Sequence, residues 1–128
     1  MSRVHAEHNE KLCSKLLAEK QFFDWVVTTA FYSALHYTEH QLFPLKIVAV
    51  TYPTFNHYYD SVLKKNHRIS KHEGKAQLVN SNLTCGSRYR WLLDACSNAR
   101  YIDYNINEQT ANLAKTCLDD IKACIIKA

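Results

Sequence analysis

The sequence predicts an all-α protein, a single up-and-down bundle of four to five helices over residues 1–128. Apolar residues make up 47% of the chain, which is enough to bury a core, and its length corresponds to one domain. Only two glycines and two prolines occur, whereas all-β domains need many turns rich in these residues. There is also no run of about 18 apolar residues that would span a membrane.

The first two helices are predicted from the spacing of apolar residues. Over residues 3–20 an apolar stripe is formed by Leu12, Cys13, Leu16 and Leu17. Residues 22–43 are apolar almost all the way round, which is typical of the central, most buried helix. One polar strip interrupts that helix, at four-residue spacing: Asp24, Thr28, Tyr32, His36 and His40. Pro44 ends it.

Residues 44–66 form the irregular part of the chain. The run "KIVAV" is short and β-branched, but no second strand is evident nearby. We therefore expect a long loop, with one helical turn near residues 58–63. Loops of this length inside compact domains often have a function or are mobile.

Three further helices are expected after residue 69. Ser70 is a predicted N-cap, and Glu73 completes a capping box, although Gly74 weakens the helix that follows. Ser87 is the predicted cap of a fourth helix. The last helix starts at Asn105 or Asn107 and is amphipathic to the end of the chain. For the Asn105 start, the residue that completes the capping box is Glu108.

The stretch "LHYTEHQLF" contains His36, Glu39 and His40, spaced as in the inverted zinc-protease motif H-x-x-E-H. A zinc protease also needs a third protein ligand, an open coordination position and a substrate cleft. No other segment offers an obvious third ligand, and the motif lies on the helix expected to be central. We therefore predict no metal site, with His36 in the core and His40 exposed.

The five cysteines show no C-x-x-C pair and no repeated spacing, so neither a disulfide framework nor a thiolate zinc site is expected. The apolar helical patterns contain Cys13, Cys96, Cys117 and Cys124, where a thiol behaves as a small hydrophobic group. The N-terminal residues are polar and lack the apolar core of a signal peptide. The expected location is cytoplasmic.

Positive charge is concentrated in residues 64–100, which carry eight basic and two acidic residues, a net charge of +6 within a total of +4. Basic side chains cluster at Lys64, Lys65, His67, Arg68, Lys71, His72 and Lys75. A second group, "SRYRW", interleaves Arg88 and Arg90 with aromatic residues. Such patterns suit phosphates and stacked bases, although a solvated basic face is the alternative. Two glycines cannot form a phosphate-binding loop, and no cofactor is predicted.

Three segments taken together resemble the small stand-alone HEPN-domain proteins: "FFDWVVTTAFYSALHYTEHQLF", "HRISKHEGKAQLV" and "YRWLLDACSNARYIDYNI". The resemblance covers Leu12 to Ile125, and its most specific pieces are the pattern A-x-Y-x-A-L-H-x-x-E and the stretch "SNARY". It implies a bundle of four or five helices that pairs as a homodimer. Many such proteins are RNases or RNA-binding modules in toxin–antitoxin, defence or RNA-processing systems, and some have a nucleotidyltransferase partner.

The family's catalytic signature is an Arg, a polar residue, and a His four to six residues after the Arg. The matching region here begins at Arg100, but Tyr101 replaces the polar residue, and the place of the His is taken by Tyr104, Asn105 or Ile106. None of these is an imidazole that can exchange a proton near neutral pH. Arg100 can still hold a phosphate. We therefore expect weak or no RNase activity.

Three interpretations follow. In the first, an RNA- or nucleotide-binding dimer uses a set of basic and aromatic residues: Arg100, Arg88, Arg90, Lys71, Lys75, Tyr101 and Tyr104. In the second, a metal-independent ribonuclease takes its histidine from His67 or His72. Arg68 and His72, spaced R-x3-H, are the fallback catalytic pair. In the third, the chain is an interaction module, antitoxin-like or a scaffold, and the aromatic stretch "TYPTFNHYY" docks another protein.

Overall fold

A computed structural model of the chain describes residues 2–66 and 69–126. Its five long helices are α1 (Ser2–Ala18), α2 (Phe23–Leu42), α5 (Lys71–Asn82), α6 (Gly86–Tyr101) and α7 (Glu108–Cys124). These confirm the all-α prediction. The structure adds a sixth helical segment, formed by α3 (Phe55–Tyr58), a π-helix (Tyr59–Leu63) and α4 (Lys64–Asn66). His67 and Arg68 lie outside the described residues, so the structure does not place these two predicted site residues.

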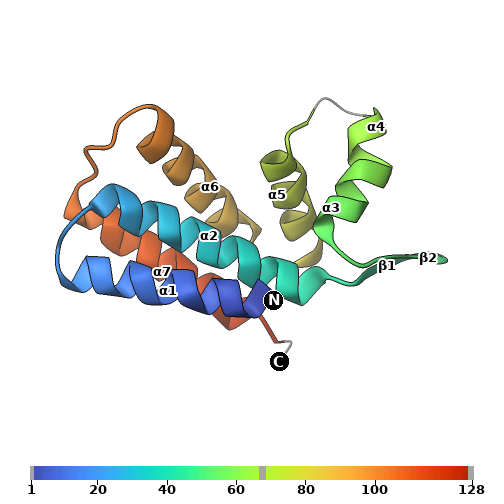
Figure 1. Cartoon of the computed structure of the whole chain (residues 1–128), viewed down its shortest axis with the longest axis horizontal. Coiled ribbons are helices and arrows are strands. Elements are labelled where there is room, and N and C mark those ends of the chain that lie inside the picture. Colours follow the sequence, from blue (N-terminus) through green and yellow to red (C-terminus); the bar gives the residue numbers. More distant parts are fainter. Residues whose placement is uncertain (1, 67–68, 127–128) are drawn as a thin grey trace.

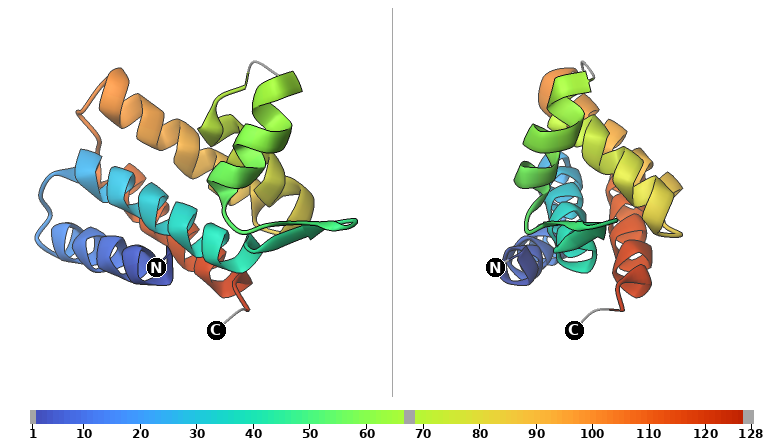
Figure 2. Two further views of the ribbon diagram at one scale, coloured as in Figure 1. Left: turned by 45° about the vertical axis from the view of Figure 1, so that its right-hand side comes forward. Right: turned by 90° about the vertical axis from the view of Figure 1, so that its right-hand side faces the viewer.

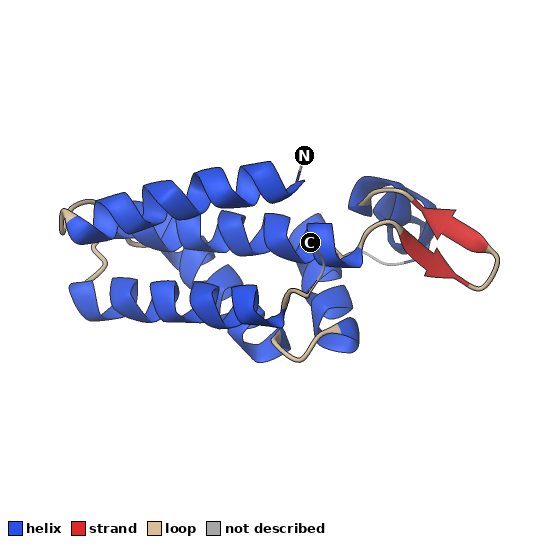
Figure 3. Cartoon of the chain, turned by 90° about the horizontal axis from the view of Figure 1, so that it is seen from below, coloured by secondary structure: helices blue, strands red, loops and turns tan. Residues whose placement is uncertain are grey.

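Helix α2 is the centre of the bundle and packs against α1, α6 and α7 (Figure 1). Helix α5 packs on α6 and on the π-helix instead, so that α5 and the α3–α4 segment lie together at the C-terminal end of α2 (Figure 2). Viewed from below, a short β-hairpin projects from this end, beyond the helices (Figure 3). None of the helices within residues 2–66 and 69–126 has the length and apolar character needed to cross a membrane.

The core is built around α2, as the apolar pattern predicted. Eleven residues of this helix are buried, including Phe31 and Tyr37. The shortest hydrogen bonds between α2 and α1 are buried or partly buried: Ser33 Oγ donates to the Ala6 carbonyl at 2.7 Å, and Tyr37 Oη donates to a Glu10 carboxylate oxygen at 2.6 Å. Buried side chains that interact with α1 therefore fix the position of α2.

The prediction of a long loop over residues 44–66 was wrong, except that the helical turn expected near residues 58–63 is present as part of a longer helical segment. The run "KIVAV" folds back on itself as an antiparallel hairpin, in which β1 (Leu45–Ile47) pairs with β2 (Val50–Tyr52). Its turn contains no Gly or Asn to signal it, and Val48 takes up a left-handed backbone with φ of 56°. Residues 55–66 are helical and cover a small second core, made of Phe43, Phe55, Tyr58 and Leu78.

The helix starts were predicted in part. Ser70 caps α5, since its Oγ accepts a hydrogen bond from the Glu73 backbone N–H at 3.1 Å. Ser87 is not a cap: α6 begins one residue earlier, at Gly86, whose missing side chain lets the helix start against the backbone of α5. Of the two alternatives for α7, Asn107 is correct and Asn105 is wrong.

Candidate nucleic-acid interface

Arg100 lies in the last turn of α6, with its side chain exposed and directed at α2. Its Nη1 donates a hydrogen bond to Tyr32 Oη at 2.8 Å. The guanidinium also lies 5.9 Å from the ring centroid of Tyr32 and 5.4 Å from that of Tyr101. Burial raises the pKa of Tyr32 above its ordinary value, so its phenol stays protonated at neutral pH. Two aromatic rings thus hold Arg100 without neutralising its charge.

Three of the other predicted cations, Arg88, Arg90 and Lys75, are paired with carboxylates. Arg88 Nε donates to Asp120 at 2.7 Å, and the two Nη atoms of Arg90 each donate to one Glu73 oxygen at 2.6 Å. The buried Lys75 ammonium is paired with Glu39 of α2.

The predicted arginines do not share one surface of the protein. Arg88 and Arg90 are two positions apart on α6, which places their side chains on different sides of the helix, toward α7 and α5 respectively. Neither shares the α2 contact of Arg100. The three arginines of the first interpretation are therefore directed toward three different helices, α7, α5 and α2. Among the arginines that the structure describes, Arg100 is the one that contacts no carboxylate, since Arg3 lies beside Glu7.

The first turn of α5 brings His72 to the same aromatic residue as Arg100. The His72 ring lies 6.2 Å from the Tyr32 ring and 5.5 Å from that of Phe31, centroid to centroid. Burial lowers the pKa of His72 below its ordinary value of 6.5, and the charges of Lys75 and Arg100 lower it further. An imidazole that is neutral at pH 7 therefore stands near Arg100, although no histidine follows Arg100 at the family's spacing.

A depression of about 300 Å³ opens beside Arg100, between the start of α2 and the end of α6. Its lining consists of Asp24, Trp25, Thr28, Ala99, Arg100 and Tyr104. Trp25 and Tyr104 are 50% and 71% exposed, and the neighbouring Tyr101 is 76% exposed, which leaves ring faces open to a ligand. We call this depression the Arg100 pocket.

Sequence reasoning had selected Arg100, Tyr101, Tyr104 and His72 but not Trp25 or Tyr32. The signal was present in the polar strip of α2, because the four-residue spacing of Asp24, Thr28 and Tyr32 puts them on one side of the helix. Lys71, the remaining predicted cation, is exposed, and its ammonium lies 5.8 Å from the Tyr59 ring centroid.

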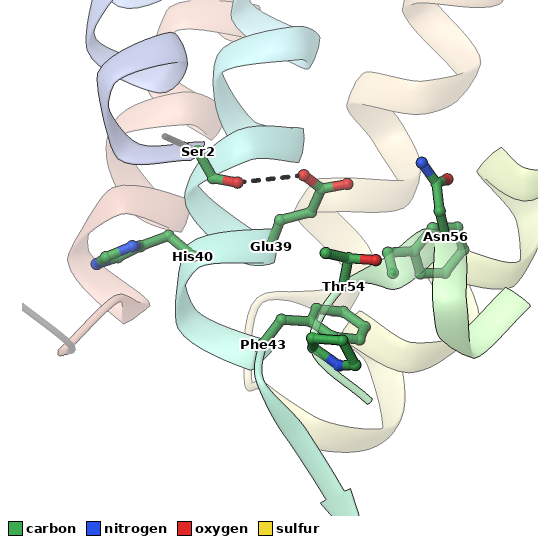
Figure 4. Close-up of a pocket in the computed structure, with 8 residues that line it drawn as sticks. Ser2, Glu39, His40, Phe43, Thr54 and Asn56 are labelled. Atoms are coloured by element: carbon green, nitrogen blue, oxygen red, sulfur yellow. Dashed lines mark hydrogen bonds between the residues drawn. The ribbon is translucent and has the colours of Figure 1, made fainter. Parts of the chain in front are cut away.

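A second depression, of about 340 Å³, lies at the other end of α2, where Glu39 faces Thr54 and Asn56 (Figure 4). Ser2 Oγ donates to Glu39 at 3.4 Å, and the His36 Nδ1 lies 3.7 Å from the same carboxylate. Burial raises the pKa of Glu39, but His36 and Lys75 more than offset this and bring the pKa to about 2. Glu39 is thus ionised at neutral pH and paired with Lys75.

The three H-x-x-E-H residues do not converge on one point, because His36 lies beside Glu39 but His40 does not. Figure 4 shows His40 leaving α2 on the opposite side from the Glu39 carboxylate. His36 and His40 are both half-buried, so His36 is more exposed and His40 less exposed than predicted, and the buried Nδ1 of His36 makes no hydrogen bond with the described part of the chain. In residues 2–66 and 69–126, no three His, Cys, Asp or Glu side chains are grouped so that they could hold a metal ion.

The aromatic stretch "TYPTFNHYY" is not an exposed docking surface. Phe55 and Tyr58 are buried in the second core, and Tyr52 and Tyr59 are half-buried against it. The third interpretation therefore loses the surface on which it depended.

Comparison with known proteins leaves the site to be interpreted from its own chemistry. No family model, no curated protein and no solved structure matches the chain.

Proposed function

We propose that the protein binds single-stranded RNA or a nucleotide at the Arg100 pocket. The observation that carries the proposal is a guanidinium without a carboxylate partner, held by Tyr32 and surrounded by exposed aromatic rings. Such a guanidinium can hold a phosphate, and Trp25, Tyr101 and Tyr104 offer faces on which bases can stack. The helical bundle is compatible with the HEPN resemblance, and we infer a cytoplasmic homodimer with a toxin, antitoxin or nucleotidyltransferase-type partner from that resemblance alone.

The proposal is tested by the fluorescence anisotropy of a labelled single-stranded RNA. Losing one charge-assisted contact to phosphate costs about 1.5–3 kcal/mol, so Arg100→Gln should weaken binding about tenfold or more. Arg88→Gln is the matched control, because Arg88 is an exposed arginine of the same helix already occupied by Asp120. Equal affinities for wild type and Arg100→Gln, or equal losses in both variants, would contradict the assignment.

Metal-independent RNA cleavage is a second candidate function, favoured by the position of His72. A neutral imidazole near a phosphate-holding arginine can accept the proton of a ribose 2′-hydroxyl as general base. Cleavage should persist in EDTA and disappear in His72→Gln, while RNA binding is retained. Because the His72 imidazole must be unprotonated to act as a base, the cleavage rate should rise with pH. It should reach its plateau at a pH lower than the ordinary His pKa of 6.5 would give. Cleavage that survives in His72→Gln would remove this candidate.

A further inference from the structure

The Arg100 pocket contains a carboxylate as well as a guanidinium. Asp24 is half-buried in the first turn of α2, and its carboxylate makes no hydrogen bond or ion pair with any residue in 2–66 or 69–126. Only its backbone carbonyl is used, accepting from Thr28 Oγ1 at 2.8 Å. The indole of the next residue, Trp25, is exposed beside it in the same pocket. The pocket therefore places a carboxylate without a partner among the described residues beside a flat apolar ring, about two helical turns along α2 from the Tyr32–Arg100 contact.

An ionised carboxylate only accepts hydrogen bonds, and its two oxygens suit two donors side by side. Guanine presents such a pair on its Watson–Crick edge, the N1–H and the 2-amino group. Adenine and cytosine each place one amino donor beside a ring acceptor, and uracil has one N–H between two carbonyls. A base of those three kinds would set at least one acceptor against a carboxylate oxygen, which costs binding energy rather than adding it.

We propose that the Arg100 pocket selects guanine, with Asp24 accepting from N1–H and the 2-amino group, the base stacked on Trp25, and the phosphate held by Arg100. The inference rests on the proposed function and adds to it the identity of the base. The volume of about 300 Å³ is at the lower end of the range for ligand pockets, which suits a single nucleotide rather than a duplex.

The test uses tryptophan fluorescence. The chain has two tryptophans, so Trp91→Phe leaves Trp25 as the sole reporter at the pocket. Guanosine, inosine, adenosine, cytidine and uridine 5′-monophosphates are titrated into this variant up to millimolar concentration. We expect the guanosine nucleotide to quench Trp25 with about tenfold higher affinity than the others, in line with the discrimination of a bidentate contact. Inosine differs from guanosine only by the missing 2-amino group. The inosine nucleotide should therefore bind the unchanged Asp24 protein more weakly than the guanosine nucleotide does.

A substitution then tests the carboxylate itself. Asp24→Asn keeps the shape of the side chain and should reduce the preference for guanosine over inosine to less than about threefold. Asp94→Asn is the matched control, an exposed aspartate of α6 outside the pocket, and should preserve the preference. Thermal unfolding of both variants shows whether each one folds.

The outcomes separate the two proposals. Equal affinities for the five nucleotides, with Arg100→Gln still weakening all of them, would overturn guanine selection and leave phosphate binding in place. A guanosine preference that survives in Asp24→Asn would also overturn it. Absence of quenching by every nucleotide, together with absence of RNA binding, would overturn both the selection and the proposed function.

Discussion

The ion pair between Lys75 and Glu39 should decide how firmly α5 is held to the bundle. Lys75 is only 5% exposed, and Glu39 reaches it from α2, although the backbones of the two helices do not pack closely. Removing one partner of such a pair strands a charge in a poorly hydrated site, whereas replacing both with apolar residues is often neutral.

The magnitude follows from Glu39. Its pKa falls from 4.5 to about 2 on folding, which at 1.36 kcal/mol for each pH unit corresponds to about 3 kcal/mol of stability. His36 supplies part of this, so Lys75→Met should cost about 2 kcal/mol. Burial lowers the pKa of Lys75, and Glu39 restores only part of it, so desolvation offsets much of what the pair contributes. The double variant Glu39→Leu with Lys75→Met should therefore lie within about 1 kcal/mol of wild type.

Urea unfolding followed by circular dichroism measures these free energies. The pH dependence supplies an independent check. A depressed carboxyl pKa contributes stability that is fully present above pH 4.5, the unfolded value, and is lost as the pH falls through about 2. The difference between wild type and Lys75→Met should shrink over that interval. A single variant as stable as wild type at pH 7, or a double variant less stable than Lys75→Met, would refute the reasoning.

Three further predictions concern the fold. Asn107→Ala should cost about 1 kcal/mol in urea unfolding, because it removes the cap of α7, while Asn105→Ala should change stability little. Gly86→Ala should cost about 2 kcal/mol, since the added methyl carbon would lie 2.8 Å from a backbone atom of α5; unchanged stability would show that the helices separate freely. In native protein one of five thiols, Cys124, should react quickly with Ellman's reagent, because the others are buried and burial raises the pKa of Cys85 to about 12. Fast reaction of two or more thiols would contradict that.

Prediction from the sequence succeeded where the residues of a single helix were enough to define it. The apolar pattern of residues 22–43 located the central helix, and Ser70 located the start of α5. The sequence was insufficient where the outcome depended on a partner far along the chain. The carboxylates that neutralise Arg88 and Arg90 are 32 and 17 positions away, on other helices. No local pattern shows which basic residues keep their charge for a ligand.

The hairpin was missed for a related reason. Its turn places Val48 in a left-handed conformation that β-branched residues rarely adopt, so turn chemistry gave no signal. The candidate site was predicted in part for the opposite reason: Arg100 and Tyr101 are adjacent in sequence, whereas Tyr32 and His72 reach Arg100 only through the packing of α2 and α5 on α6.

Because several basic residues are already paired with carboxylates of the protein, the salt concentration should have a limited effect on ligand affinity. Each phosphate neutralised by a protein cation releases condensed counterions, and the logarithm of the affinity falls with the logarithm of salt concentration by about 0.7 per contact for single strands. With Arg88, Arg90 and Lys75 already bound to carboxylates, a ligand at Arg100 that also reached Lys71 would give a slope of only about −1.4. A chain of net charge +4 should thus recognise a short segment of nucleic acid, in a complex whose affinity falls only about 25-fold for each tenfold rise in salt concentration.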